Sequence, residues 1–174
     1  ITILSTLSYG KVDSTSPFYD FNVQTLEGKK YSFSKLKNKP VLIVNTASKC
    51  GFTPQLADLE TLNQKYSKKG LVILAVPSND FKQEKDTAEE ILDVAHKNYK
   101  TTFVFLEKQT ITGKDKSSLY QFLLSKNPSP LFPEIRWNFE KFLIDKNGTV
   151  VDRWSSLTKP TSDEIQKKIE DVLK

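Results

Sequence analysis

The stretch Pro40-Val-Leu-Ile-Val-Asn-Thr-Ala-Ser-Lys-Cys-Gly-Phe-Thr-Pro-Gln55 decides the fold, because it joins an apolar run to the start of a helix. Residues 40–45 are rich in β-branched side chains and have the length of a strand that is buried on both faces. Beyond them, Thr53 is a candidate N-cap with Pro54 at the first helical position, and apolar residues then recur at helical spacing until Gly70. The stretch therefore predicts a buried strand that leads into a helix.

Cys50, the only cysteine of the chain, lies within this junction. Just before a helix N-terminus, unpaired backbone N–H groups and the helix dipole favour an anion, and they can lower a thiol pKa below its free value of about 8.5. The ionised sulfur is the reactive form of cysteine. A lone cysteine can also be a small buried apolar residue, but its place at the junction favours a reactive thiolate.

Composition narrows the possible classes of protein. The chain has 174 residues, of which 37% are apolar and 27% charged, as expected for one globular domain. The net charge of +5 comes from scattered lysines and arginines without a basic stripe, so we expect no nucleic-acid partner. No segment reaches the ~20 apolar residues of a membrane span. One cysteine and one histidine, His96, leave no cluster for a metal, and His96 is expected to be a solvated surface residue.

The first residues allow two interpretations. Residues 1–10 are uncharged, and Ser8 and Gly10 have the spacing of a signal-peptidase site, which indicates the end of an export signal. A flexible lead or an extra strand explains them equally well. We therefore expect residues 1–16 to be a lead or a signal remnant and residues 17–174 to form one domain. The compartment, exported or cytoplasmic, depends on which interpretation holds.

Hydrophobic periodicity and turn signals predict the order of the remaining elements. They are a hairpin of residues 18–24 and 30–33, a strand at 71–77, a helix at 87–99 with Thr87 and Glu90 as capping box, a strand at 102–106, a helix at 117–124, a hairpin at 141–154 that turns on Asn147-Gly148, and a helix at 161–173 with Thr161 and Glu164 as capping box. Alternating strands and helices predict parallel pairing in the first half, and the late hairpin adds antiparallel strands. The expected fold class is α/β, a thioredoxin-like mixed sheet flanked by helices with an N-terminal hairpin.

Four blocks of the chain resemble the glutathione peroxidases, in their cysteine-containing form. In chain order they are Asn-Thr-Ala-Ser-Lys-Cys-Gly-Phe-Thr-Pro-Gln at 45–55, Leu-Ala-Val-Pro-Ser-Asn-Asp-Phe at 74–81, Trp-Asn-Phe-Glu-Lys-Phe at 137–142 and Arg-Trp-Ser-Ser-Leu-Thr-Lys-Pro at 153–160. The resemblance extends over nearly the whole chain from Phe18 onward. It implies a peroxidase that reduces peroxides with a peroxidatic cysteine and uses a thiol as co-substrate, without a bound cofactor.

The resemblance also implies four site residues, which fall on Cys50, Gln83, Trp137 and Asn138. A peroxidatic thiolate needs nearby donors that stabilise it and the charge on the departing oxygen, and an indole N–H and two amides supply them. Without the resemblance, Trp137 would be interpreted as a core aromatic and Gln83 as a solvated loop residue. The loop Phe81-Lys-Gln-Glu84 is one residue shorter than the Phe-Gly-x-Gln-Glu usual in the family, and Asp80 is a second candidate beside it.

The chain has no cysteine near residues 95 and 96, where thioredoxin-dependent members of the family carry a resolving cysteine. Oxidised Cys50 would then be a sulfenic acid that external thiols reduce, and this favours a one-cysteine cycle with glutathione. The alternatives are a thioredoxin-dependent peroxidase, a peroxide sensor that passes its oxidation to a protein partner, and a binding module on the same scaffold. Residues 113–136 are short compared with tetrameric members. This implies a monomer whose open site admits organic and lipid hydroperoxides as well as hydrogen peroxide.

Overall fold

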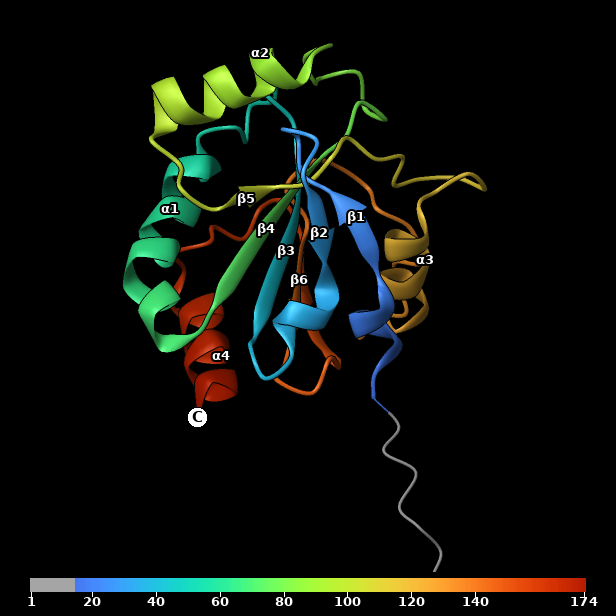
Figure 1. Cartoon of the computed structure of the whole chain (residues 1–174), viewed down its shortest axis with the longest axis vertical. Helices are drawn as coiled ribbons and strands as arrows, with labels where there is room; N and C mark the ends of the chain where they lie inside the picture. The colour runs from blue at the N-terminus through green and yellow to red at the C-terminus, as the bar shows by residue number, and fades with distance from the viewer. Residues whose placement is uncertain (1–14) are drawn as a thin grey trace, which may run out of the picture.

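The computed structural model describes residues 15–174 and has a mixed five-stranded sheet at its centre (Figure 1). The strands are β3 (Val41–Thr46), β4 (Val72–Pro77), β5 (Val104–Phe105), β6 (Lys141–Ile144) and β7 (Val150–Trp154). Their order is β5-β4-β3-β6-β7, with β3 parallel to β4, β4 parallel to β5, and the other two pairings antiparallel. The predicted mixed sheet is confirmed. The predicted lead or signal remnant lies almost wholly outside the described residues, so the boundary after residue 16 stays a prediction.

The predicted N-terminal hairpin is present as a separate two-stranded sheet. Strands β1 (Asn22–Gln24) and β2 (Lys30–Ser32) pair antiparallel, and the turn between them contains Gly28 at φ +80°. Short 3₁₀ turns flank the hairpin at Pro17–Asp20 and Phe33–Leu36. A single bridge between Thr25 and Leu106 joins the hairpin to the end of β5.

Within residues 15–174, four α-helices pack around the sheet. They are α1 (Gln55–Tyr66), α2 (Ala88–Asp93), α3 (Ser118–Ser125) and α4 (Asp163–Leu173). A 3₁₀ turn follows α1 and ends at Gly70, whose φ of +113° stops the helix as predicted. The capping box of Thr87 and Glu90 is also confirmed, and α2 continues as a π-helix over Val94–Asn98. No helix within residues 15–174 is long and apolar enough to cross a membrane.

The central strand β3 is buried along its whole length, and its residues 41–44 are all apolar, because both of its faces are covered. Leu42 and Val44 pack in the core cluster that contains residues of α1 and α4, whereas Val41 and Ile43 pack in the cluster that contains α3 and the N-terminal hairpin. Figure 1 shows α1 and α4 on one side of the sheet and α3 on the other. A strand buried on both faces has no alternation to preserve, which explains the continuous apolar run.

Two predicted caps are wrong, and each correct cap lies one residue further along the chain. The residue before α1 is Pro54, while the hydroxyl of Thr53 accepts the N–H of Cys50 at 3.0 Å and donates to the carbonyl of Ala47 at 2.8 Å. Ser162 caps α4 by accepting the N–H of Ile165.

The predicted partner of the second cap, Glu164, has another role. Its carboxylate accepts the indole N–H of Trp154 at 2.9 Å. The strand predicted at 102–106 is also shorter than expected and is confined to Val104–Phe105.

Candidate active site

Cys50 lies between β3 and α1, at the carboxyl end of the central strand. Only 7% of the residue is exposed. Its Sγ accepts the backbone N–H of Phe52 at 3.4 Å, and its own N–H is bound by the Thr53 hydroxyl. One tight turn, residues 51–54, separates the sulfur from the first residue of α1. The hydrogen bond to Sγ thus comes from an N–H group of this turn, and not from an N–H group of α1.

Gln83 and Asn138 come together, and Gln83 also binds the residue before Cys50, although the three segments are far apart in sequence. Asn138 is fully buried, and its Nδ2 donates to Oε1 of Gln83 at 2.9 Å. The carbonyl of Gln83 accepts the N–H of Lys49, the residue before Cys50, at 2.8 Å. The bond to Asn138 uses the oxygen of the Gln83 amide and not its nitrogen. Within the described residues, the two N–H donors of this amide are therefore available for another acceptor.

The shortened loop before Gln83 closes without the glycine of the usual family pattern. Lys82 adopts a left-handed conformation at φ +61°, and its N–H donates to the carbonyl of Asn79 at 2.9 Å. The carboxylate of Asp80 is bound by the N–H groups of Ile111 and Thr112, at 2.7 and 2.9 Å. Asp80 therefore holds the loop after β5, and Gln83 is the residue of this loop that contacts Asn138.

Trp137 is 38% exposed, so it is not the core aromatic that its residue type alone would predict. Its ring packs against that of Phe81, with centroids 5.1 Å apart. Together with Phe52 and Leu157 it lines a mainly apolar hollow of about 270 Å³. One lining residue, Phe52, also donates its N–H to Sγ of Cys50, so the hollow and the Cys50 loop share this residue. An apolar hollow of this kind suits the organic part of a hydroperoxide.

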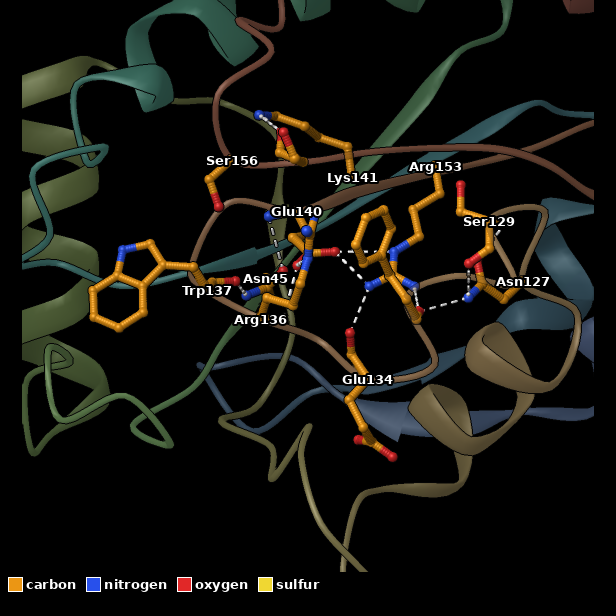
Figure 2. Close-up of polar contacts among 12 residues, drawn as sticks. Asn45, Asn127, Ser129, Glu134, Arg136, Trp137, Glu140, Lys141, Arg153 and Ser156 are labelled. Carbon is orange, nitrogen blue, oxygen red and sulfur yellow. Dashed lines mark hydrogen bonds and ion pairs between the residues drawn. The ribbon is translucent and has the colours of Figure 1, made fainter.

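Asn45, near the end of β3, fixes the segment that carries Trp137 and Asn138. Its Nδ2 donates to the carbonyl of Trp137 at 3.0 Å, and its Oδ1 accepts the N–H of Glu140 at 3.1 Å. Its carbonyl accepts the N–H of Phe139 at 2.7 Å. In Figure 2 the indole of Trp137 points away from this polar network, which is consistent with its exposure.

A buried ion pair between Arg153 and Glu140 adjoins the segment that carries Trp137 and Asn138. Arg153 on β7 donates from Nε and Nη2 to Oε2 of Glu140, at 2.9 and 2.6 Å (Figure 2). Arg153 also donates to the carbonyls of Phe132 and Glu134, the latter at 2.8 Å. The pair thus ties the loop before Trp137 to the sheet.

Sequence reasoning missed these supporting residues. Asn45, Glu140 and Arg153 are buried polar residues within otherwise apolar strands or at their ends, and this is the only local signal that they give. Within residues 15–174 no group of three or more histidine, cysteine and acidic side chains could hold a metal ion. His96 is exposed on the π-helix, as expected.

Comparison with known proteins agrees with the resemblance seen in the sequence. Residues 18–124 match the sequence model of the family described as glutathione peroxidase. The chain is 47% identical over 161 residues to glutathione peroxidase-like peroxiredoxin 2 of Saccharomyces cerevisiae, which covers 91% of this chain and 98% of the yeast protein. It is 42% identical over 153 residues to the hydroperoxy fatty acid reductase Gpx2 of Synechocystis, covering 87% and 96% of the two chains.

Solved structures give the same result for the fold. The crystal structure of GPX1 from T. cruzi superposes with a TM-score of 0.73 at 32% identity, covering 90% of this chain and 95% of the other. A thioredoxin family protein from Chlorobium tepidum superposes with a TM-score of 0.64 at 15% identity, covering 92% and 97%, which bears on the fold alone. The predicted thioredoxin-like fold is confirmed. The chain belongs to the glutathione peroxidase family and is a thiol peroxidase, an oxidoreductase that reduces hydroperoxides at the expense of thiols.

Proposed function

We propose that Cys50 is the peroxidatic residue and that Gln83, Trp137 and Asn138 assist it, with glutathione as the reductant in a one-cysteine cycle. The observation that supports this most directly is the contact of three distant segments. The N–H of Lys49 meets the carbonyl of Gln83, and the amide of Gln83 meets that of Asn138. A nucleophile and uncharged donors therefore share one site.

In the first step the Cys50 thiolate attacks one oxygen of the hydroperoxide. An S–O bond forms, the O–O bond breaks, and the departing oxygen leaves as water or an alcohol once it has gained a proton. Negative charge develops on that oxygen before the proton arrives, and N–H donors aimed at it lower the barrier. The free N–H groups of Gln83 supply such donors, and so does the indole N–H of Trp137. Asn138 holds Gln83 through the bond to Oε1.

In the second stage external thiols reduce the sulfenic acid. A first thiol displaces water from the sulfenic sulfur to give a mixed disulfide, and a second thiol attacks this disulfide and releases Cys50 as a thiolate. The chain itself holds no second cysteine to take part. Two molecules of glutathione satisfy the balance. Thioredoxin, or a protein partner that receives the oxidation, is the alternative.

We propose a broad peroxide range and a monomeric state for the same protein. The apolar hollow beside Trp137 gives room for the carbon skeleton of organic and lipid hydroperoxides. The relative from Synechocystis bears the name of a hydroperoxy fatty acid reductase. The short segment at residues 113–136 supports the monomer by analogy, and a tetrameric mass in gel filtration would contradict it.

The decisive experiment measures peroxide consumption with a glutathione-recycling system and, in parallel, with a thioredoxin-recycling system. Cys50→Ser serves as the blank. Turnover with glutathione alone supports the one-cysteine cycle, and turnover with thioredoxin alone contradicts glutathione as the reductant. If Cys50 is oxidised by peroxide but neither system recycles it, the protein is a sensor or relay. Peroxide consumption by Cys50→Ser equal to that of the wild type would contradict the role of Cys50.

A further inference from the structure

A buried carboxylate, Glu84, joins the loop that carries Cys50 to the loop that carries Gln83. The residue is 2% exposed. Its Oε1 accepts the backbone N–H of Ser48 at 3.0 Å, while the next N–H, that of Lys49, donates to the carbonyl of Gln83 at 2.8 Å. Two successive N–H groups before Cys50 are therefore bound by two successive residues of the other loop. We call this arrangement of Ser48, Lys49, Gln83 and Glu84 the clasp.

We propose that Glu84 is a positioning residue for peroxide reduction, which sets the Gln83 amide relative to Sγ of Cys50. The proposal rests on the function proposed above, because it assumes that Gln83 acts on the Cys50 reaction. Glu84 itself touches neither substrate nor sulfur in this role. It acts through the backbone of both loops.

The loop of Gln83 needs such an anchor, because its conformation is unfavourable by itself. Lys82 has φ +61°, which costs a non-glycine residue roughly 1–2 kcal/mol. Besides the clasp, the N–H of Glu84 is held by Oδ1 of Asn79 at 3.2 Å, and the side chain of Gln83 is held by Asn138. If the clasp opened, Lys82 would be free to relax, and the Gln83 amide would move with it.

The chemistry of Glu84 argues against a role in stability alone. Burial raises the pKa of its carboxyl group, and hydrogen bonding by Ser48 and by the N–H of Lys85 opposes this effect. Its Oε2 is buried and has no hydrogen-bond partner in the described part of the chain. A carboxylate that loses its hydration in this way contributes little net stability. Glu84 instead fixes the position of the Cys50 loop relative to the Gln83 loop.

Glu60 provides a matched control elsewhere in the molecule. It is also buried, with 8% exposure, and its carboxylate binds the N–H of Thr102 at 2.8 Å and the hydroxyl of Thr102 at 2.7 Å. Like Glu84, it links a helix or loop to a backbone N–H far away in sequence. Its hydrogen bonds lie with Gln64 on its own helix and with Thr102 before β5, and with neither loop of the clasp.

The test is a double-mutant cycle on the rate at which the reduced protein reacts with hydrogen peroxide. Glu84→Ala should slow this reaction by about 10- to 100-fold, since a displacement of about 1 Å costs up to that factor. Glu84→Gln keeps the acceptor and should stay within about threefold of the wild type. Because Glu84 acts through Gln83, the double variant Glu84→Ala with Gln83→Ala should be as slow as Gln83→Ala alone. Glu60→Ala should lower the melting temperature and leave the rate unchanged.

A second variant guards against a failure of Glu84→Ala to fold. Glu84→Asp withdraws the carboxylate by one methylene group and should also slow the reaction at least fivefold. The proposal is overturned if Glu84→Asp and Glu84→Ala react at the wild-type rate, or if the two substitutions of the cycle multiply their effects. Failure of the proposed function is seen separately, because then Gln83→Ala or Cys50→Ser would retain the wild-type rate.

Discussion

Replacement of Arg153 by methionine should lower the free energy of unfolding by about 4 kcal/mol, because the loss of one partner of a buried ion pair costs about 3–5 kcal/mol. The side chains of Arg153 and Glu140 are 3% and 1% exposed, so water cannot solvate the Glu140 carboxylate in place of the guanidinium. Arg153 makes two bonds to Glu140 Oε2. Methionine has a similar length and fills most of the volume of arginine, so the substitution removes the charge with little change in packing.

Loss of the hydrogen bonds from Arg153 to two carbonyls contributes less to the expected decrease in the free energy of unfolding. Those carbonyls belong to Phe132 and Glu134, which lie on an exposed loop where water can take the place of the guanidinium. With a slope of about 2 kcal/mol per molar urea, the expected loss lowers the urea midpoint by about 2 M. Urea titration followed by tryptophan fluorescence measures it directly.

The double variant Arg153→Met with Glu140→Gln is the control for this reasoning. Removal of the buried carboxylate should recover part of the loss, since the largest contribution is the charge of Glu140, which would keep only Arg136 as a partner among the described residues, with its N–H at 2.8 Å and its Nε at 3.7 Å from Oε1. A loss below about 1 kcal/mol in Arg153→Met would refute the reasoning, because it lies below the range for buried pairs. Simple addition of the two single effects would refute it as well.

Three further changes test other parts of the structure. Burial lowers the pKa of Lys141 from 10.5 to about 7, so between these pH values the unfolded chain holds a proton that the folded protein has released. The free energy of unfolding should therefore rise with pH over this window, and Lys141→Met should flatten the rise in urea titrations at several pH values. Ser162→Ala should lower stability by about 1 kcal/mol, whereas Thr161→Ala should change it by less than about 0.5 kcal/mol in the same titrations, since only Ser162 caps α4. Gly148→Ala should lower the melting temperature, because Gly148 has φ +75° and a Cβ there would lie 2.6 Å from Cβ of Ser16.

The sheet could be predicted because its signals are local and repeated. The apolar runs at residues 40–45 and 71–77 and the Asn147-Gly148 turn each fix one strand or hairpin, and alternation with helices then fixes the parallel pairing. The caps at Thr53 and Thr161 were wrong for a local reason too. At α4, Ser162 offers the same chemistry as Thr161, and backbone dihedral angles, which the pattern does not contain, decide between them. At α1, the Thr53 hydroxyl is bound within the loop that precedes the helix.

The candidate site was predictable in unequal parts. Cys50 follows from its place after an apolar strand, but Gln83, Trp137 and Asn138 came only from the resemblance to a family. The residues that support them gave only one weak signal, a polar residue within or beside an apolar strand. The bond between Asn45 and Glu140 joins positions 95 apart, and that between Ser48 and Glu84 joins positions 36 apart. Such pairs depend on the finished fold, so hydrophobic periodicity cannot find them.

The end of the sheet explains why stability and site geometry depend on the same residues. Strand β6 begins at Lys141, next to Glu140, so the backbone just before it needs hydrogen-bond partners beyond the paired residues of β3 and β6. Asn45 supplies them to Phe139 and Glu140, and it also binds the carbonyl of Trp137. It therefore fixes the backbone on both sides of Asn138. Since Glu140 is in turn bound by Arg153, the ion pair and the Gln83–Asn138 contact share one segment of chain. Weakening of the ion pair should therefore slow the reaction of Cys50 with peroxide even while the protein remains folded.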